Sequence, residues 1–119
     1  MNHFDSKKYN LLALKSSKKY IHNKPFPHIQ FKNFLSKNYA SKLYKQFPKY
    51  NSNIWINHKK FGKNKNVNFK KAQHDERKFP KILRELFREL NSRQFILFLE
   101  TLTGIDSLIP DPYLIGGGL

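Results

Sequence analysis

Histidines and carboxylates are the residues in this chain of 119 that could hold a metal ion or exchange protons. His3-Phe4-Asp5 has the H-x-D spacing of a metal-ligand pair. A pattern of three residues arises easily by chance, and this one precedes the first strand that we expect, so we assign it no ligand role. His74-Asp75-Glu76 is interpreted as a solvated turn before a helix. No metal-ligand spacing is found among the other histidines: His22, His28, His58 and His74.

Three consecutive glycines, Gly116 to Gly118, have the composition of a phosphate-binding loop. Such a loop also needs a following Lys and Ser or Thr, and a helix whose first turn receives the phosphate. Leu119 follows the glycines instead, and no helix is expected there. No Ser/His/Asp arrangement can be argued from spacing either. We therefore assign no catalytic, cofactor-binding or metal-binding residue within the chain.

A formal net charge of +15, from 23 basic and 8 acidic residues, is the strongest compositional signal. Such a surplus is typical of proteins that bind phosphate backbones or anionic surfaces. Nearly all of it is Lys, whereas recognition of base edges favours Arg. Lys, Asn, Ile, Phe and Tyr are abundant together, so we interpret the charge mainly as codon bias from an AT-rich genome. The arginines are Arg77, Arg84, Arg88 and Arg93.

Aromatic residues alternate with lysines around the segment 57–71, which we predict to form a hairpin with the basic residues at its exposed tip. Trp55, Phe61 and Phe69 could stack on single-stranded nucleic acid if they were exposed. We prefer the interpretation that Trp55 and Ile56 pack in the core while the lysines are solvated. Nonspecific nucleic-acid binding remains the alternative partner class, and the alternative function is a small basic nucleic-acid-binding protein without catalysis.

The rest of the composition predicts a folded cytoplasmic chain. Hydrophobic residues make up 39% and aromatic residues 15%, enough for a packed core. The chain has no Cys, which excludes disulfides and thiolate metal sites. The longest apolar run, Phe95 to Leu99, is far shorter than the roughly 18 residues of a membrane span, and no secretion signal is present. We therefore expect no membrane partner.

The apolar spacing predicts both strands and helices. Residues 1–24 form a polar, Lys-rich segment with a short helix near 11–14. His28 to Phe31 alternates polar and apolar residues, the period of a half-buried strand. We expect further strands at 53–57 and 67–69. Helices are predicted over 36–47, 80–90 and 92–103, where apolar residues recur three and four apart.

Turn chemistry marks the ends of these helices. Pro48 ends the first, Pro80 opens the second, and Asn91-Ser92 separates the second from the third. Gly104 is placed to end the third helix in the left-handed conformation. One helical face is predicted for these residues of the first helix: Tyr39, Ala40, Leu43, Tyr44 and Phe47.

The last third of the sequence resembles a known enzyme family. A buried helix ends at Leu102-Thr103-Gly104, then Leu108-Ile-Pro-Asp-Pro-Tyr113 leads to Gly116-Gly-Gly-Leu119. This order is similar to the segment before the catalytic barrel of bacterial Fe(II)/2-oxoglutarate-dependent dioxygenases of the prolyl 4-hydroxylase-like type. Pro25-Phe-Pro-His-Ile29, followed by Phe34-Leu-Ser36, resembles the opening strand and helix of the same proteins, so the similarity covers 25–119.

The resemblance implies an α+β fold in which helices pack on the first strands of a double-stranded β-helix, or jelly roll. Residues 25–119 would be the amino-terminal part of that oxygenase domain, truncated before the H-x-D motif. Fe(II) would be held by two His and one carboxylate further along, with 2-oxoglutarate and O2 at the open positions and ascorbate as an accessory reductant. The fragment alone would bind neither cofactor and would be inactive. Candidates for the mouth of the site are Asp111, Tyr113, Gly116, Gly117 and Gly118.

The resemblance also implies the reaction but leaves the substrate open. The complete protein would hydroxylate a peptide, a small molecule or a sugar-linked group. Glycines at 116–118 also have a structural interpretation, since they permit a bulge or close strand packing, and we prefer it to a site role.

Overall fold

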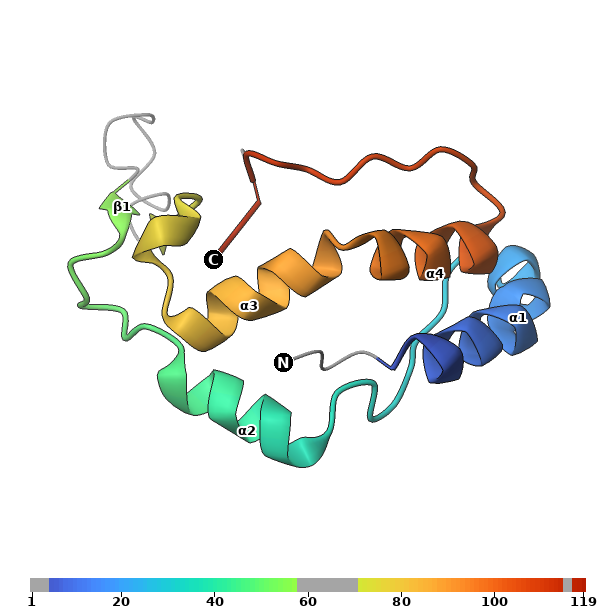
Figure 1. Ribbon diagram of the computed structural model, residues 1–119, viewed down its shortest axis with the longest axis horizontal. Helices are drawn as coiled ribbons and strands as arrows, with labels where there is room; N and C mark the ends of the chain where they lie inside the picture. The colour runs from blue at the N-terminus through green and yellow to red at the C-terminus, as the bar shows by residue number, and fades with distance from the viewer. Residues whose placement is uncertain (1–4, 58–70, 115–116) are drawn as a thin grey trace. The chain divides into compact units, whose positions relative to one another are not determined.

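The computed structural model describes residues 5–57, 71–114 and 117–119 (Figure 1). The described residues form four α-helices, α1 (Ser6–His22), α2 (Lys37–Gln46), α3 (Lys81–Leu90) and α4 (Arg93–Thr103). A short 3-10 helix, η2 (Glu76–Lys78), precedes α3. Two strands of two residues each, β1 (Ile56–Asn57) and β2 (Lys71–Ala72), pair antiparallel with Ile56 opposite Ala72.

The prediction of a jelly-roll fold is wrong, because the described residues are mainly helical. The β1–β2 pair offers two residues per strand, whereas a jelly roll needs two sheets built from eight strands. The strand predicted at 53–57 is reduced to β1. The one predicted at 67–69 lies outside the described residues. None of the helices in the described ranges is long and apolar enough to cross a membrane.

The segment His28 to Phe31 explains one error. Its side chains alternate as predicted, with Ile29 and Phe31 half-buried and His28 and Gln30 exposed. The segment nevertheless forms no strand. Its apolar side chains reach helix α4 instead, where the rings of Phe31 and Phe98 lie 6.2 Å apart. Alternating burial therefore arose from packing on a helix and did not require a neighbouring strand.

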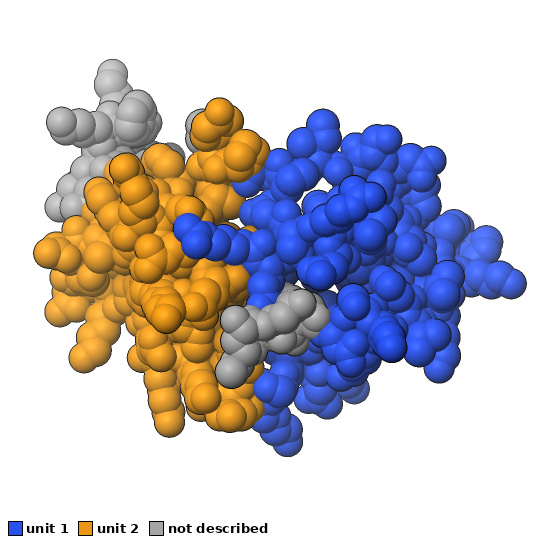
Figure 2. Space-filling view, in the orientation of Figure 1, with its two compact units in different colours: residues 1–37, 88–111 blue, residues 38–87, 112–119 orange. Residues whose placement is uncertain are grey.

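The chain divides into two compact units, each formed by two separate stretches (Figure 2). Unit 1 comprises residues 1–37 and 88–111, and unit 2 comprises residues 38–87 and 112–119.

Helix α1 is the first element of unit 1 and packs along α4 (Figure 1). It begins at Asp5, whose carboxylate accepts hydrogen bonds from the backbone N–H groups of Lys7 and Lys8 at 3.0 and 3.3 Å. Such a cap satisfies amides that have no partner within the helix. Tyr9 and Ala13 are buried at α1. The polar segment 1–24 thus contains a helix of 17 residues, longer than the short one expected.

Helix α4 begins and ends as its sequence predicts. The Ser92 hydroxyl accepts a hydrogen bond from the Phe95 N–H at 3.2 Å, and Gly104 ends the helix in the left-handed conformation with φ of +74°. Phe98 and Leu102 are buried, but Leu97 is 40% exposed. The helix therefore has one buried side, whereas we had predicted burial on most sides.

In unit 2, helix α2 lies within the predicted range but buries a narrower face. Tyr39 and Leu43 are buried, while Tyr44 is 84% and Phe47 48% exposed. Tyr44 and Phe47 follow the correct helical period, but the period cannot show how far across the helix the core extends. Of the five residues predicted to share one helical face, only Tyr39 and Leu43 are therefore buried.

Helix α3 follows Pro80 directly and buries Leu83. Phe79, just before the helix, is buried, and its ring lies 5.2 Å from that of Phe87. Lys81 and Glu85 form a surface ion pair, with 3.9 Å between Nζ and Oε1. An exposed pair of this kind contributes only a few tenths of a kcal/mol, roughly, so the apolar contacts stabilise α3 more than the charges do.

Candidate functional site

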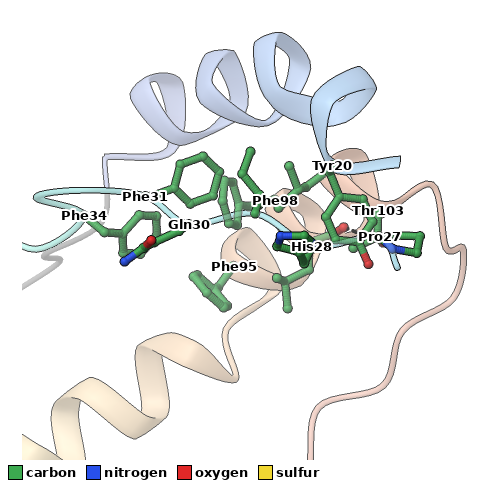
Figure 3. Close-up of a pocket in the computed structure, with 12 residues that line it drawn as sticks. Tyr20, Pro27, His28, Gln30, Phe31, Phe34, Phe95, Phe98 and Thr103 are labelled. Atoms are coloured by element: carbon green, nitrogen blue, oxygen red, sulfur yellow. Dashed lines mark hydrogen bonds between the residues drawn. The ribbon is translucent and has the colours of Figure 1, made fainter. Parts of the chain in front are cut away.

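Unit 1 contains an open cavity of about 630 Å³ between α4 and the segment 27–34 (Figure 3). Phenylalanine rings gather toward one end of the close-up, and His28, Pro27 and Thr103 lie toward the other. The lining is mainly apolar and consists of Tyr20, Pro27, His28, Ile29, Gln30, Phe31, Phe34, Phe95, Phe98, Leu99, Leu102 and Thr103.

Contacts between rings form the aromatic wall of this cavity. Phe34 lies 5.8 Å from Phe98 and 6.4 Å from Phe95, measured between ring centroids. Tyr9 packs behind them, 4.7 Å from Phe34 and 5.8 Å from Phe98. The Tyr9 hydroxyl donates a hydrogen bond to the Phe34 carbonyl at 2.8 Å, which fixes the loop against α1. We call these four residues together with Phe31 the aromatic cluster.

Two polar side chains at the cavity, those of His28 and Thr103, contact the backbone. His28 Nδ1 lies 2.7 Å from the Phe26 carbonyl. The Thr103 hydroxyl donates to the Leu99 carbonyl at 2.8 Å and accepts from the Ile105 N–H at 3.2 Å. The side chains of His28 and Thr103 thus stabilise the local backbone. The cavity is therefore better suited to apolar contact with a ligand than to acid–base catalysis.

Unit 2 is organised around Gln73, whose side chain is fully buried. Its amide nitrogen donates to the Ile54 carbonyl, and its amide oxygen accepts from the Asp75 N–H at 2.9 Å. Its backbone N–H and carbonyl both bond Leu119, at 3.1 and 3.0 Å. Two hydrogen bonds exchanged by facing residues are the pattern of an antiparallel strand pair. Leu119 therefore makes a strand-like backbone contact with Gln73, directly after β2.

Gly118 is required by this contact. Its φ is +91°, and a Cβ atom at this position would collide with the Gln73 carbonyl oxygen and lie 3.2 Å from His74 Cα. Glycine accommodates both the left-handed backbone and the close approach. The preferred interpretation of the glycine run, close strand packing, thus accounts for Gly118.

None of the proposed mouth residues that the structure describes lines the cavity of unit 1. Tyr113 is 73% exposed, and the Asp111 N–H donates to the Asn91 side-chain oxygen at 3.1 Å. Gly117 N–H bonds the Leu114 carbonyl at 2.9 Å, which closes a turn. Gly116 lies outside the described residues. Asp111 belongs to unit 1 and Tyr113 to unit 2, so their mutual placement is left open.

Iron does not fit the residues that the structure describes. In these ranges no group of three His, Asp or Glu could hold a metal ion. Asp5 of the H-x-D triplet caps α1, and His3 lies outside the described residues. His74 is exposed beside Asp75, which caps η2. Any Fe(II) and 2-oxoglutarate would have to be bound by other residues.

Tyr9 and Asp75 have shifted pKa values, and the hydrogen bond to Asp75 raises the pKa of Arg77. Burial raises the pKa of the Tyr9 phenol above its usual value of 10.0, and the carboxylates of Asp5 and Glu89 raise it further. Hydrogen bonds from Arg77 lower the pKa of Asp75 to about 2. The Arg77 guanidinium donates to both carboxylate oxygens at 2.9 Å. Asp75 is accessible to solvent and sits at a helix start, so we interpret its shift as structural.

No family model, curated protein or solved structure matches this chain.

The main feature that the sequence did not reveal is the structural role of Gln73. One glutamine in a polar stretch carries no period or motif. Its role depends on hydrogen bonds to Ile54, Asp75 and Leu119, two of which are distant in the sequence.

Proposed function

We propose that this chain supplies the helical region that precedes the iron ligands in an Fe(II)/2-oxoglutarate-dependent dioxygenase. The sequence resemblance over 25–119 supports the proposal, above all the order from α4 through Leu108–Tyr113 to Gly116–Leu119. In that family such a region comes before the metal-binding residues, and the described residues are mainly helical. The alternative in which the chain is no part of an enzyme is tested by the same experiment.

The pairing of Leu119 with Gln73 is the observation that carries the proposal. In the resemblance, Gly116 to Leu119 leads directly toward the H-x-D pair. Here the backbone of Leu119 exchanges two hydrogen bonds with Gln73. A strand held at this point has a defined register, because neighbouring residues then face opposite sides of the sheet. Gln73 would therefore orient the ligand-bearing residues that follow.

The chain's own contribution to the chemistry is positional. Bound Fe(II) and 2-oxoglutarate would supply the oxidising power for hydroxylation. Gln73 would hold the incoming strand, and Gly118 would allow its close approach. The aromatic cluster would stabilise unit 1.

The test is to read the source DNA in frame beyond codon 119 and express the entire reading frame. We expect an H-x-D motif soon after Leu119 and another His further on. The expressed protein should convert 2-oxoglutarate to succinate in the presence of Fe(II) and O2. The control replaces the motif histidine with alanine, which removes one of three iron ligands and should abolish succinate formation.

Two results would contradict the proposal. A stop codon directly after codon 119 would leave the protein without the family's ligands. An extension lacking the H-x-D motif and the later His would do the same. In either case the resemblance would be a coincidence of apolar spacing and glycine content.

A further inference from the structure

Several aromatic rings are exposed where helix α2 ends and the following loop leads to β1. Tyr44 is 84% exposed, Tyr50 55% and Phe47 48%. Trp55 is partly exposed beside them. Together with Lys71 we call these residues the aromatic–lysine surface; all five belong to unit 2. Singly exposed apolar residues are ordinary, but several gathered rings mark a binding surface.

Contacts hold three of these rings, those of Phe47, Tyr50 and Trp55, in place. The rings of Phe47 and Trp55 lie 6.0 Å apart, and the Trp55 indole N–H donates to the Lys49 carbonyl at 2.8 Å. Lys71 Nζ donates to the Tyr50 carbonyl at 2.7 Å and lies 4.0 Å from the centroid of the Tyr50 ring. The surface is therefore organised before any ligand arrives, which lowers the entropy that binding would cost.

The stretch of chain that carries the exposed rings has charges of a single sign. No Asp or Glu occurs between Asp5 and Asp75 in the sequence. Lys42, Lys45 and Lys49 are exposed on α2 and on the loop that follows it. A ligand seated on the rings would thus meet lysines and no neighbouring carboxylate from this stretch of chain.

We propose that the aromatic–lysine surface binds single-stranded nucleic acid. Unpaired bases present flat π faces that stack on Tyr, Phe and Trp, and their phosphates attract lysines without requiring a base sequence. An acidic peptide would satisfy the charge but would leave the rings without partners. A duplex buries its base faces, so it would engage the lysines alone. The scarcity of Arg fits binding without base-edge recognition.

This inference does not depend on the proposed dioxygenase function. It rests on residues 44–55 and 71, whereas that proposal rests on Gln73, Gly118 and Leu119. It also differs from the hairpin hypothesis, since Phe61 and Phe69 lie outside the described residues. Trp55, predicted to pack in the core, is only partly buried.

The first experiment titrates the 119-residue chain with oligothymidylate of about 12 nucleotides and follows tryptophan fluorescence. Trp55 is the sole tryptophan, so the signal comes from the proposed surface. We expect saturable quenching at about 0.15 M salt. Duplex DNA of the same length and inorganic polyphosphate should quench far less, because neither offers unpaired bases.

Variants test the stacking and the charge separately. Tyr44→Leu and Tyr50→Leu should each weaken oligothymidylate binding by about tenfold, since each removes a stacking face. Lys45→Gln should weaken binding and reduce the slope of log affinity against log salt by about one. Tyr113→Leu removes a tyrosine that is 73% exposed outside the surface, so its affinity should match that of the unaltered chain. Circular dichroism checks that each variant is folded.

Three outcomes would overturn the proposal. Equal quenching by polyphosphate would show attraction to charge alone. Quenching by vesicles of phosphatidylserine and phosphatidylcholine, without a response to oligothymidylate, would assign the surface to anionic lipid. Unchanged affinity in folded Tyr44→Leu and Tyr50→Leu variants would place the nucleic acid elsewhere on the chain.

Discussion

The interior of unit 1 is made of aromatic rings, whereas unit 2 is organised around the amide of Gln73. In unit 1, Phe98 contacts the rings of Tyr9, Phe31, Phe34 and Phe95. Unit 2 also buries apolar residues, including Phe79 and Leu83, but Gln73 joins three separate stretches by hydrogen bonds.

The difference lies in how strictly geometry is specified. Ring packing is non-directional, so its stability scales with buried area and tolerates small shifts. A buried amide is stable only while its donors and acceptors are paired, and an unpaired one costs about 1–3 kcal/mol. The stability of unit 1 should therefore fall when side-chain volume is removed. The stability of unit 2 should fall when the backbone shifts by a small distance.

The largest effect is expected from Phe98→Ala in unit 1. Phe98 is 3% exposed and lies at the centre of the aromatic cluster. Removing its ring should lower the free energy of unfolding by about 3–5 kcal/mol, measured by urea denaturation with circular dichroism. Leu97→Ala is the matched control, because Leu97 is adjacent on α4 and 40% exposed. Equal losses from both variants would contradict the ring-centred description of unit 1.

A smaller effect, confined to unit 2, is expected from Gly118→Ala. The new methyl group meets the Gln73 carbonyl and also forces alanine into the left-handed region. We expect a loss of about 3 kcal/mol, together with faster amide exchange at Leu119 by nuclear magnetic resonance.

Gly104→Ala provides the control for Gly118. Gly104 has a similar positive φ of +74°, but nothing lies within 4 Å of its added Cβ. Its loss should be limited to about 1–2 kcal/mol from backbone strain. If the two alanine variants were equally stable, the close contact with Gln73 would not matter.

Tyr9→Phe tests a directional bond within the aromatic cluster. The variant keeps the ring but removes the hydroxyl that bonds the Phe34 carbonyl, so we expect a loss of about 1 kcal/mol. The raised pKa of Tyr9 predicts a pH effect of definite sign. The folded state favours the neutral phenol, so this stability is complete below about pH 10 and is lost as the pH rises further.

The measurement compares urea midpoints of the unaltered chain and Tyr9→Phe between neutral pH and about pH 11. The difference between them should shrink as Tyr9 ionises. Tyr44→Phe is the control, because Tyr44 is 84% exposed. A constant difference at all pH values would mean that the Tyr9 proton is not coupled to folding.

The smallest effect is expected at Asp75, a half-buried residue that caps η2. Its lowered pKa means that its contribution is present above about pH 4 and is lost as the pH falls toward about 2. Asp75→Asn should therefore shift the urea midpoint slightly at pH 5 and not at pH 2. Asp106→Asn, which removes an exposed loop carboxylate, controls for net charge. A larger effect at pH 2 than at pH 5 would reverse the assigned sign.

Apolar period and end-capping residues predicted the helices well. Ser92, Gly104 and Pro80 act locally, so their roles follow from neighbours in the sequence. The family resemblance, by contrast, led to the wrong fold class. A strand needs a partner, and alternation such as that of His28 to Phe31 also arises when a loop packs on a helix.

The candidate sites were harder to predict. The hydrogen bonds of Gln73 are made with Ile54 and Leu119, which are distant in the sequence. The exposure of Tyr44 depends on how far the core extends around helix α2. The family resemblance identified Gly118 as one of several candidates, but its steric role required the position of Gln73. Local rules therefore predicted elements, and contacts distant in sequence determined what the elements do.

The contact between Tyr9 and Phe98 has a consequence for synthesis. A chain leaves the ribosome amino terminus first, at about 5–20 residues per second. Helix α1 therefore emerges well before α4, the helix against which it packs. Until then the apolar side of α1 lacks its contacts with α4, and a nascent chain in this interval is most exposed to chaperones and to aggregation.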